Sequence, residues 1–163
     1  MQYAKEQILW GVLRLSMGWI FLWPFLDKLF GFGFATEPDK SWLAGSSPTL
    51  GFLKFGTNGP FSELFQSLAG NPVVDWLFML GLLAAGLGLI LGIMVRLAAW
   101  GGIMILLLIY LAALPPEHNP FLDEHLIYIL ILIGISITRP SQWFGLGKWW
   151  TATSLVQRRP WLE

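Results

Sequence analysis

The chain has 163 residues, of which 55% are hydrophobic and only 12% are charged, and its formal net charge is zero. Soluble domains carry about 25% charged residues, so this composition indicates an integral membrane protein, and the balanced charge predicts no nucleic-acid partner. The sequence contains no cysteine, which excludes disulfides, thiolate nucleophiles, iron–sulfur clusters and cysteine-ligated zinc.

Four apolar segments predict an all-α integral membrane protein, a single domain built as a bundle of four transmembrane helices in the lipid bilayer. The segments cover about residues 7–30, 73–94, 97–114 and 122–138. A helix needs about 20 apolar residues to cross a bilayer. The last two segments are shorter than this, so we expect them to require tilt or local thinning of the membrane.

The connections differ greatly in length. Only a tight turn around Arg96 separates the second and third segments, which predicts an antiparallel helical hairpin. A proline-punctuated loop from Pro115 to Asp123 joins the third and fourth segments. Residues 31–72 form a connection far longer than usual, so we expect this outer loop to have structure of its own.

Within the outer loop, apolar residues recur at helical spacing between Pro60 and Gly70. They are Phe61, Leu64, Phe65 and Leu68. This spacing predicts a short amphipathic helix. The stretch from Ser47 to Phe55 is a second apolar piece, and we expect both to lie on the membrane surface or to cap the bundle.

Lysine and arginine residues near the ends of the segments predict the orientation. With four spans, both termini share one side, which carries six cations against three on the other side. The six are Lys5, Arg96, Arg139, Lys148, Arg158 and Arg159, and the three are Lys28, Lys40 and Lys54. We therefore expect a multi-pass protein of the cell (plasma) membrane with cytoplasmic N- and C-termini, including the tail 139–163.

Ala84, Gly88 and Gly92 are spaced four apart in the second segment. Small residues at this spacing allow two helix backbones to approach closely. Packing within the bundle is the favoured interpretation, and a dimer interface is the alternative.

Arg14 is the one charged residue well inside a span. Its guanidinium must face the bundle interior and find a partner, or extend toward the near interface. Lys28 lies on nearly the same face of the first helix. The stripe between them suits either a flat ligand or a packed neighbour.

The predicted outer ends of the helices carry the richest chemistry. We expect Lys28, Asp75, His125 and Tyr128 to converge in one polar pocket, because the ends of antiparallel helices lie at one depth. Histidine and tyrosine can donate to quinone oxygens, and a carboxylate–histidine pair can handle quinone protons. The candidate catalytic residues are His125, Tyr128 and Asp75, and the candidates for binding quinone or an anion are Arg14, Lys28 and Trp76. Helix caps and interfacial anchors are the alternative interpretation of the same residues.

The pairs Glu117–His118 and Glu124–His125 raise the question of a metal site. The chain has only two histidines, without a helical His-x-x-x-His spacing, so no metal or haem is predicted.

Long stretches resemble the DoxX/DoxD membrane family over about residues 8–150. They are LRLSMGWIFLWPFLDKLFGFGFAT, SWLAGSSPTLGFL, NGPFSELFQSLAG, VDWLFMLGLLAAGLGLILGIMVRLAAWGG, PPEHNPFLDEHLIYILILIGI and FGLGKWW. The positions that match the family are Arg14, Asp27, Lys28, Asp75, Trp76, Asn119, Asp123, His125 and Tyr128. The resemblance implies a four-helix membrane protein, similar to the large membrane subunit of a thiosulfate:quinone oxidoreductase.

That resemblance further implies electron transfer from thiosulfate to a quinone, with tetrathionate as the product and a smaller partner subunit. The chain carries no redox group of its own, so electrons would pass directly between bound substrates or through a cofactor of the partner.

Three functions remain open. The first is the membrane subunit of a quinone-linked oxidoreductase with its site at the outer face. The second is a non-catalytic structural or anchoring subunit of a larger respiratory or photosynthetic membrane complex, with ten tryptophans available for contacts with a partner subunit or a second copy. A small-solute transporter ranks last, because no charges pair across the midplane and no inverted repeat is visible.

Overall fold

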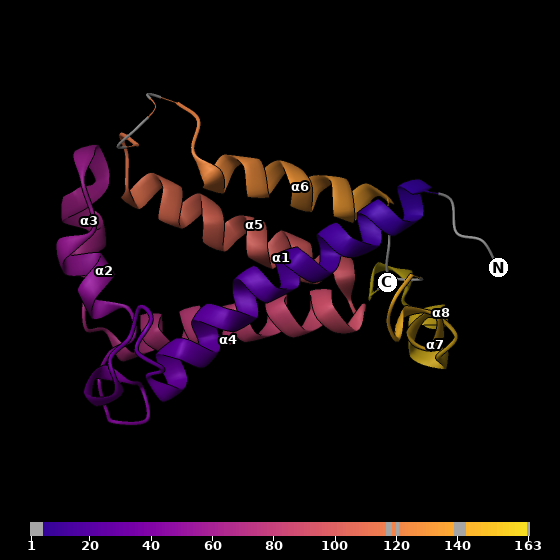
Figure 1. Cartoon of the computed structure of the whole chain (residues 1–163), viewed down its shortest axis with the longest axis horizontal. Helices are drawn as coiled ribbons and strands as arrows, with labels where there is room; N and C mark the ends of the chain where they lie inside the picture. Colours follow the sequence, from indigo (N-terminus) through magenta and orange to yellow (C-terminus); the bar gives the residue numbers. More distant parts are fainter. Residues whose placement is uncertain (1–4, 117–118, 120, 139–142, 163) are drawn as a thin grey trace.

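The computed structural model describes residues 5–116, 119, 121–138 and 143–162 (Figure 1). Four long helices form its body: α1 (Lys5–Phe30), α4 (Pro72–Leu91), α5 (Val95–Ala112) and α6 (Glu124–Thr138). They coincide closely with the four apolar segments of the sequence. The described residues contain no strand, so the all-α class is confirmed for this part of the chain.

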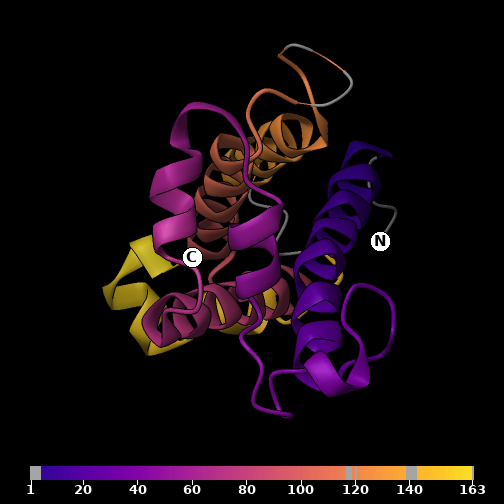
Figure 2. The ribbon, with the colours of Figure 1, turned by 90° about the vertical axis from the view of Figure 1, so that its left-hand side faces the viewer.

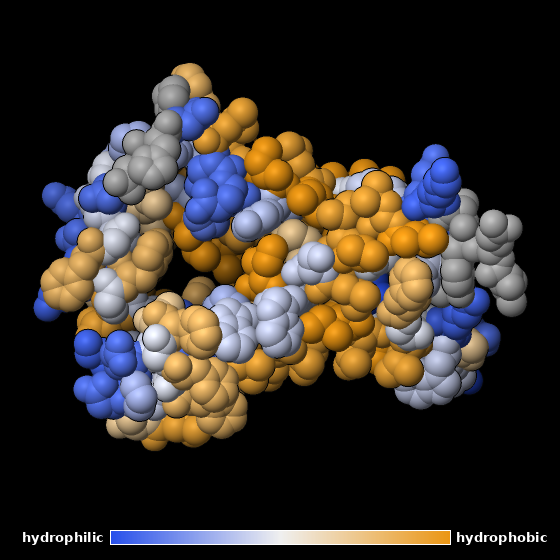
Figure 3. Space-filling model, in the orientation of Figure 1, coloured by the Kyte–Doolittle hydropathy of each residue, from blue (hydrophilic) through white to orange (hydrophobic). Residues whose placement is uncertain are grey.

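Three of the described helices are long and apolar enough to cross a membrane, namely α1, α4 and α5 with 26, 20 and 18 residues. The apolar helix α6 is shorter, with 15 residues. In the face shown in Figure 3, hydrophobic residues cover the middle of the molecule and hydrophilic residues gather toward its two ends. This distribution is typical of a protein whose middle lies in lipid.

Local sequence signals explain where α4 begins and ends. The side chain of Asn71 accepts a hydrogen bond from the Val73 amide at 2.9 Å, and Pro72 occupies the first helical position, where its missing N–H costs nothing. At the other end Gly92 adopts a left-handed conformation with φ 75°, which a glycine tolerates without strain. The chain then turns directly into α5.

The core lies where the four long helices meet. α1 packs along α4, α4 along α5 and α5 along α6, whereas α1 and α6 share a smaller contact. The buried apolar side chains come from all four helices. They include Met17 and Phe21 of α1, Leu82 and Leu89 of α4, Ala99 and Leu106 of α5, and Leu132 and Ile135 of α6.

The three small residues spaced four apart in the second apolar segment, Ala84, Gly88 and Gly92, lie in three different environments. Gly88 packs inside the α4–α5 hairpin, where an added Cβ would lie 2.7 Å from the Cβ of Ala98. Gly92 ends α4, and Ala84 is exposed. The interpretation as packing within the bundle therefore holds for Gly88.

The outer loop is structured, as its length indicated. It contains η1 (Pro38–Lys40), α2 (Leu50–Phe55), η2 (Gly59–Phe61) and α3 (Ser62–Ser67). Together η2 and α3 cover most of the stretch where an amphipathic helix was expected. Figures 1 and 2 show α2 and α3 standing across one end of the bundle, at a steep angle to its long helices. We call residues 50–67 the arm.

The C-terminal tail, expected only as a cytoplasmic extension, also forms helices: α7 (Gly147–Thr151), α8 (Ser154–Arg158) and η4 (Pro160–Leu162). It docks at the end of the bundle opposite the arm, where the Leu146 amide donates to the Leu91 carbonyl at 2.8 Å. α6 starts beside the end of α5, where the Tyr110 hydroxyl donates to the Phe121 carbonyl at 2.8 Å. α6 therefore runs between the two ends of the bundle.

Candidate functional site

A cavity of about 590 Å³ lies between the arm and the adjoining ends of α5 and α6. Its lining comes from three segments: the turn of the arm, the chain after α5, and the start of α6. The polar lining residues are Asn58, Asn119, Asp123, Glu124 and His125. In the space-filling view the molecule is hollowed between the arm and the bundle (Figure 3). This α5–α6 cavity is the polar concavity nearest to the chemistry that the sequence predicted.

His125 and Asp123 form a side-chain pair in the lining of the cavity. Nδ1 of His125 lies 2.7 Å from Oδ2 of Asp123. The other carboxylate oxygen, Oδ1, accepts from the Leu126 amide at 3.2 Å and so caps the start of α6. Because this cap holds the carboxylate in place, the carboxylate can orient the imidazole. Nε2 of His125 then remains for a ligand, as an acceptor in the neutral ring and a donor in the protonated ring.

The same turn offers metal-ligating atoms. One ligand atom from each of Asp123, Glu124 and His125 lies within 4.8 Å of the others. Both Asp123 oxygens already interact within the chain, and Glu124 is exposed. The group also sits at a helix N-terminus, whose positive end opposes a cation. Both features disfavour a cation at this turn.

Tyr128 does not line the cavity. It lies one turn beyond His125 on α6, is half-buried, and packs against the core cluster of the bundle. Of the two predicted pocket residues on α6, His125 therefore lines the cavity and Tyr128 packs against the core.

Asp75 anchors the outer loop to α4. Its carboxylate, 6% exposed, accepts hydrogen bonds from the Ser47 hydroxyl at 2.9 Å and from both the amide and the hydroxyl of Thr49. The next residue, Trp76, contacts Trp42 edge to face with ring centroids 4.6 Å apart. Asp75 and Trp76 thus both bind the outer loop at the start of α4.

Asp27 is a buried carboxylate that was not among the candidate site residues from the sequence. It is 1% exposed and accepts from the amides of Phe34 and Ala35 at 3.4 and 3.0 Å. An acidic residue in the last turn of a helix is unfavourable for the helix dipole, and this was a signal that it has a specific partner. Its neighbour Lys28 is half-buried, and no carboxylate of the described residues lies within 4.0 Å of its ammonium.

Arg14 lies in the other half of α1 and is fully buried. Its guanidinium donates to the carbonyls of Leu89 and Ile90 at the end of α4, and to those of Trp143 and Phe144 before α7. Of the two outcomes that the sequence left open, the structure shows the interior one. Its partners are backbone carbonyls, and those of Leu89 and Ile90 carry the negative end of the α4 dipole.

The expected convergence does not occur. The cavity brings His125 together with Asp123 and Glu124, whereas Lys28, Asp75, Trp76 and Tyr128 are not among its lining residues. Figure 1 shows the reason: α1 crosses the bundle diagonally, so its C-terminal end lies beside α4 and away from the start of α6. Figure 2 shows the same separation from the end of the bundle.

The fold and the cavity define an all-helical chain with three candidate membrane-spanning helices and a histidine–aspartate pair at one end of the bundle. No family model, no curated protein and no solved structure matches this chain. The DoxX/DoxD family assignment therefore stays an expectation that rests on the sequence resemblance alone.

Proposed function

We propose that this chain is a DoxX/DoxD-type membrane subunit of a quinone-linked oxidoreductase, and that the α5–α6 cavity binds the quinone head group. In this proposal α6 also crosses the cell membrane, both termini are cytoplasmic, and the cavity faces outward. The observation that carries the proposal is the His125–Asp123 pair at 2.7 Å in a cavity of about 590 Å³ at the end of membrane-spanning helices.

The pair suits the proton chemistry of a quinone. Reduction of a quinone to a quinol takes up two electrons and two protons at the two carbonyl oxygens. Asp123 accepts from Nδ1–H of His125, and in the protonated ring Nε2–H can donate to one quinone oxygen and transfer its proton there as electrons arrive, while water at the cavity mouth supplies the second proton. The electrons come from the donor or from a cofactor of a partner subunit, because the sequence offers no redox group of its own.

The charge of the lining bears on the choice of substrate. Among the described lining residues, Asp123 and Glu124 are acidic, and none is lysine or arginine. Two carboxylates disfavour a doubly charged anion such as thiosulfate but not a neutral quinone. We therefore assign quinone to this cavity. Thiosulfate, which only the resemblance implies, would be oxidised outside it.

Of the six candidate residues from the sequence, the proposal keeps His125 as the proton donor. Asp75 and Trp76 are occupied with holding the outer loop, Tyr128 packs against the core, and Arg14 is enclosed by carbonyls. Asp123 joins His125 as the residue that positions the imidazole.

Binding of a short-chain quinone to the purified protein in detergent tests the proposal. His125→Ala should weaken binding about tenfold, because a charge-assisted hydrogen bond contributes about 1.5 kcal/mol. Glu37→Gln, an exposed change in the outer loop, is the control and should bind as the unchanged protein does. Equal affinity of all three proteins would rule out this cavity as the quinone site.

A structural or anchoring subunit is the second candidate, and exposed aromatic side chains favour it. Trp19, Phe32 and Phe34 are each more than half exposed. Trp23 joins them, with ring centroids 5.7 Å from Trp19 and 5.0 Å from Phe34. Native mass measurement after detergent extraction separates the candidates. Bound quinone supports the first, whereas a stable partner subunit without quinone supports the second.

A further inference from the structure

The arm carries several exposed apolar side chains. In α2, Phe52 and Phe55 lie three residues apart on one helix face and are 38% and 78% exposed. In η2 and α3, Phe61 and Leu64 lie on one face and are 42% and 60% exposed. Contiguous exposed apolar surface of this kind marks a binding surface.

The polar residues of α3 lie on the opposite side. Glu63 and Gln66 are exposed and fall on the helix face away from Phe61 and Leu64, at 100° per residue. A helix with one apolar and one polar face, neither of them buried by the bundle, is typical of an element that lies in a membrane–water interface.

Backbone contacts fix the height of the arm along the bundle. At its start, Thr49 is bonded to Asp75 in the first turns of α4. At its middle, the Asn58 amide donates to the carbonyl of Ala112, the last residue of α5, at 2.9 Å. The arm is therefore held at the level where α4 begins and α5 ends.

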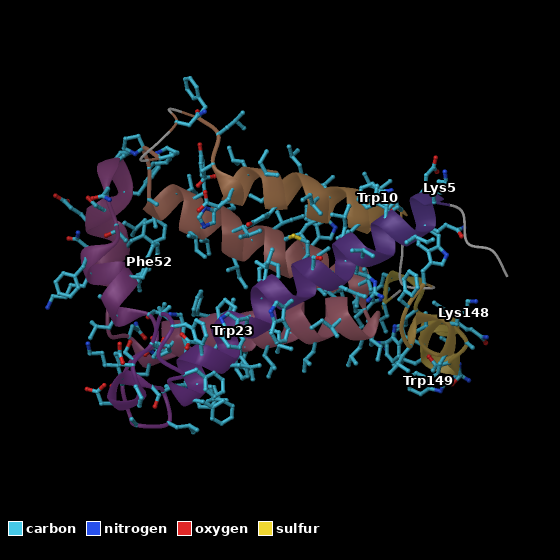
Figure 4. All side chains as sticks on the ribbon, in the orientation of Figure 1. Lys5, Trp10, Trp23, Phe52, Lys148 and Trp149 are labelled. Atoms are coloured by element: carbon cyan, nitrogen blue, oxygen red, sulfur yellow. The ribbon has the colours of Figure 1, made fainter. Side chains whose placement is uncertain are left out.

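The length of α4 places that level at the lipid boundary. Its 20 residues span about 30 Å at 1.5 Å per residue, which is the thickness of the hydrocarbon core. The arm stands across this end of the bundle (Figures 1 and 2), so its axis lies close to the membrane plane. Phe52 projects from the arm on the side turned toward the bundle (Figure 4).

Exposed aromatic residues at the end of α1 and a lysine of the arm also fit a membrane interface. The exposed aromatic residues Phe30 and Phe32 lie at the end of α1 and just after it, at the same end of the bundle. Aromatic side chains gather at membrane interfaces in this way. Lys54 adds a cation, with its ammonium 5.6 Å from the ring of Phe55, which complements lipid phosphates.

We propose that the arm is an interfacial membrane anchor: it lies in one leaflet at the boundary of head groups and acyl chains, with Phe52, Phe55, Phe61 and Leu64 in the acyl region. Glu63 and Gln66 face the water. The partner is the lipid leaflet itself. This inference rests on the membrane-spanning helices and not on the quinone site, so the two stand or fall separately.

The absence of native cysteine permits a direct test with single-cysteine spin labels. Phe55→Cys and Leu64→Cys probe the apolar faces, Glu63→Cys is the matched control on the polar face of α3, and Leu80→Cys on an exposed part of α4 is the hydrocarbon reference. Each labelled protein is reconstituted alone into vesicles of phosphatidylcholine and phosphatidylglycerol in equal parts. Collision rates of the label with oxygen and with a water-soluble nickel complex are then measured.

Oxygen concentrates in the acyl region and the nickel complex in water. The ratio of the two collision rates should be several-fold higher at positions 55 and 64 than at position 63, and close to the value at position 80. If positions 55 and 64 resemble position 63, the arm faces water, and the inference is overturned in favour of a surface for another protein. Circular dichroism of each labelled variant verifies that it keeps its helices.

Discussion

The guanidinium of Arg14 lies where the C-terminal end of α4 meets the segment before α7. The last carbonyls of a helix lack partners within the helix, and in a membrane they must find donors in the protein. Arg14 supplies donors to Leu89 and Ile90, and it also binds the carbonyls of Trp143 and Phe144. One side chain thus joins α1, the end of α4 and the C-terminal tail.

Arg14→Met should destabilise the protein by about 3 kcal/mol, because buried carbonyls lose their donor. It should also release the tail, so tryptic cleavage after the exposed Lys148 should accelerate. Thermal unfolding in detergent and a time course of proteolysis measure these two effects. Arg96→Met, at the half-exposed start of α5, is the control and should change little. A tail that stays equally protected in both variants would contradict the role of Arg14.

The sequence could show that Arg14 needed a partner, but not which one. A choice between carbonyls and lipid phosphates depends on where the tail returns, and the tail lies about 130 residues further along the chain. The same limit applies to the predicted pocket. Depth along a helix can be read from sequence, whereas the lateral distance from Lys28 to His125 depends on how α1 crosses the bundle.

Glycines show how the helices are held together. Gly86 lies at the crossing of α1 and α4, where an added Cβ would come within 2.8 Å of the Leu22 backbone nitrogen. Gly101 of α5 is different, because an added Cβ there meets no atom within 4 Å. Both glycines are in helix interiors, so alanine should favour the helix itself by about 1 kcal/mol at each position.

Gly86→Ala should therefore lower stability by about 1–3 kcal/mol, because backbone atoms of α1 must move apart. Gly101→Ala should be neutral or stabilise by up to about 1 kcal/mol. Unfolding midpoints of the two variants in the same detergent provide the comparison. A similar loss at both positions would contradict this prediction, because packing within the chain gives no reason for a loss at Gly101. Another molecule would then occupy the surface at Gly101.

At the level of elements, the sequence predicted the long helices well, because a long apolar segment marks each of them, and asparagine, proline and glycine also mark the ends of α4. α4 begins at Pro72 after Asn71 and ends at Gly92, close to the expected 73–94. The sequence did not predict that the tail forms α7 and α8. These helices have five residues each, which is too few for a periodic signal. A contact within the tail supports them: the Trp150 indole donates to the Leu162 carbonyl at 2.8 Å.

For the molecule as a whole, the decisive question is whether α6 crosses the membrane. Its 15 residues span about 22 Å at 1.5 Å per residue, less than a hydrocarbon core of about 30 Å. Yet the chain after α6 is bonded to Leu91 through Leu146, at the end of the bundle opposite the arm. Because α6 starts beside the end of α5 and the later residue Leu146 is bonded to Leu91, we expect α6 to cross the same thickness as its neighbours.

Two single cysteines in the cysteine-free chain can decide this crossing. Ala44→Cys lies in the outer loop and Gln157→Cys in α8, and both positions are exposed. With four spans and cytoplasmic termini, an impermeant maleimide added to intact cells should label position 44 at once and position 157 only after lysis. Labelling of both positions in intact cells would mean that α6 does not cross. Labelling of position 157 alone would reverse the orientation. In that case the cation bias of six against three would not set the topology, and the His125 cavity would face the cytoplasm.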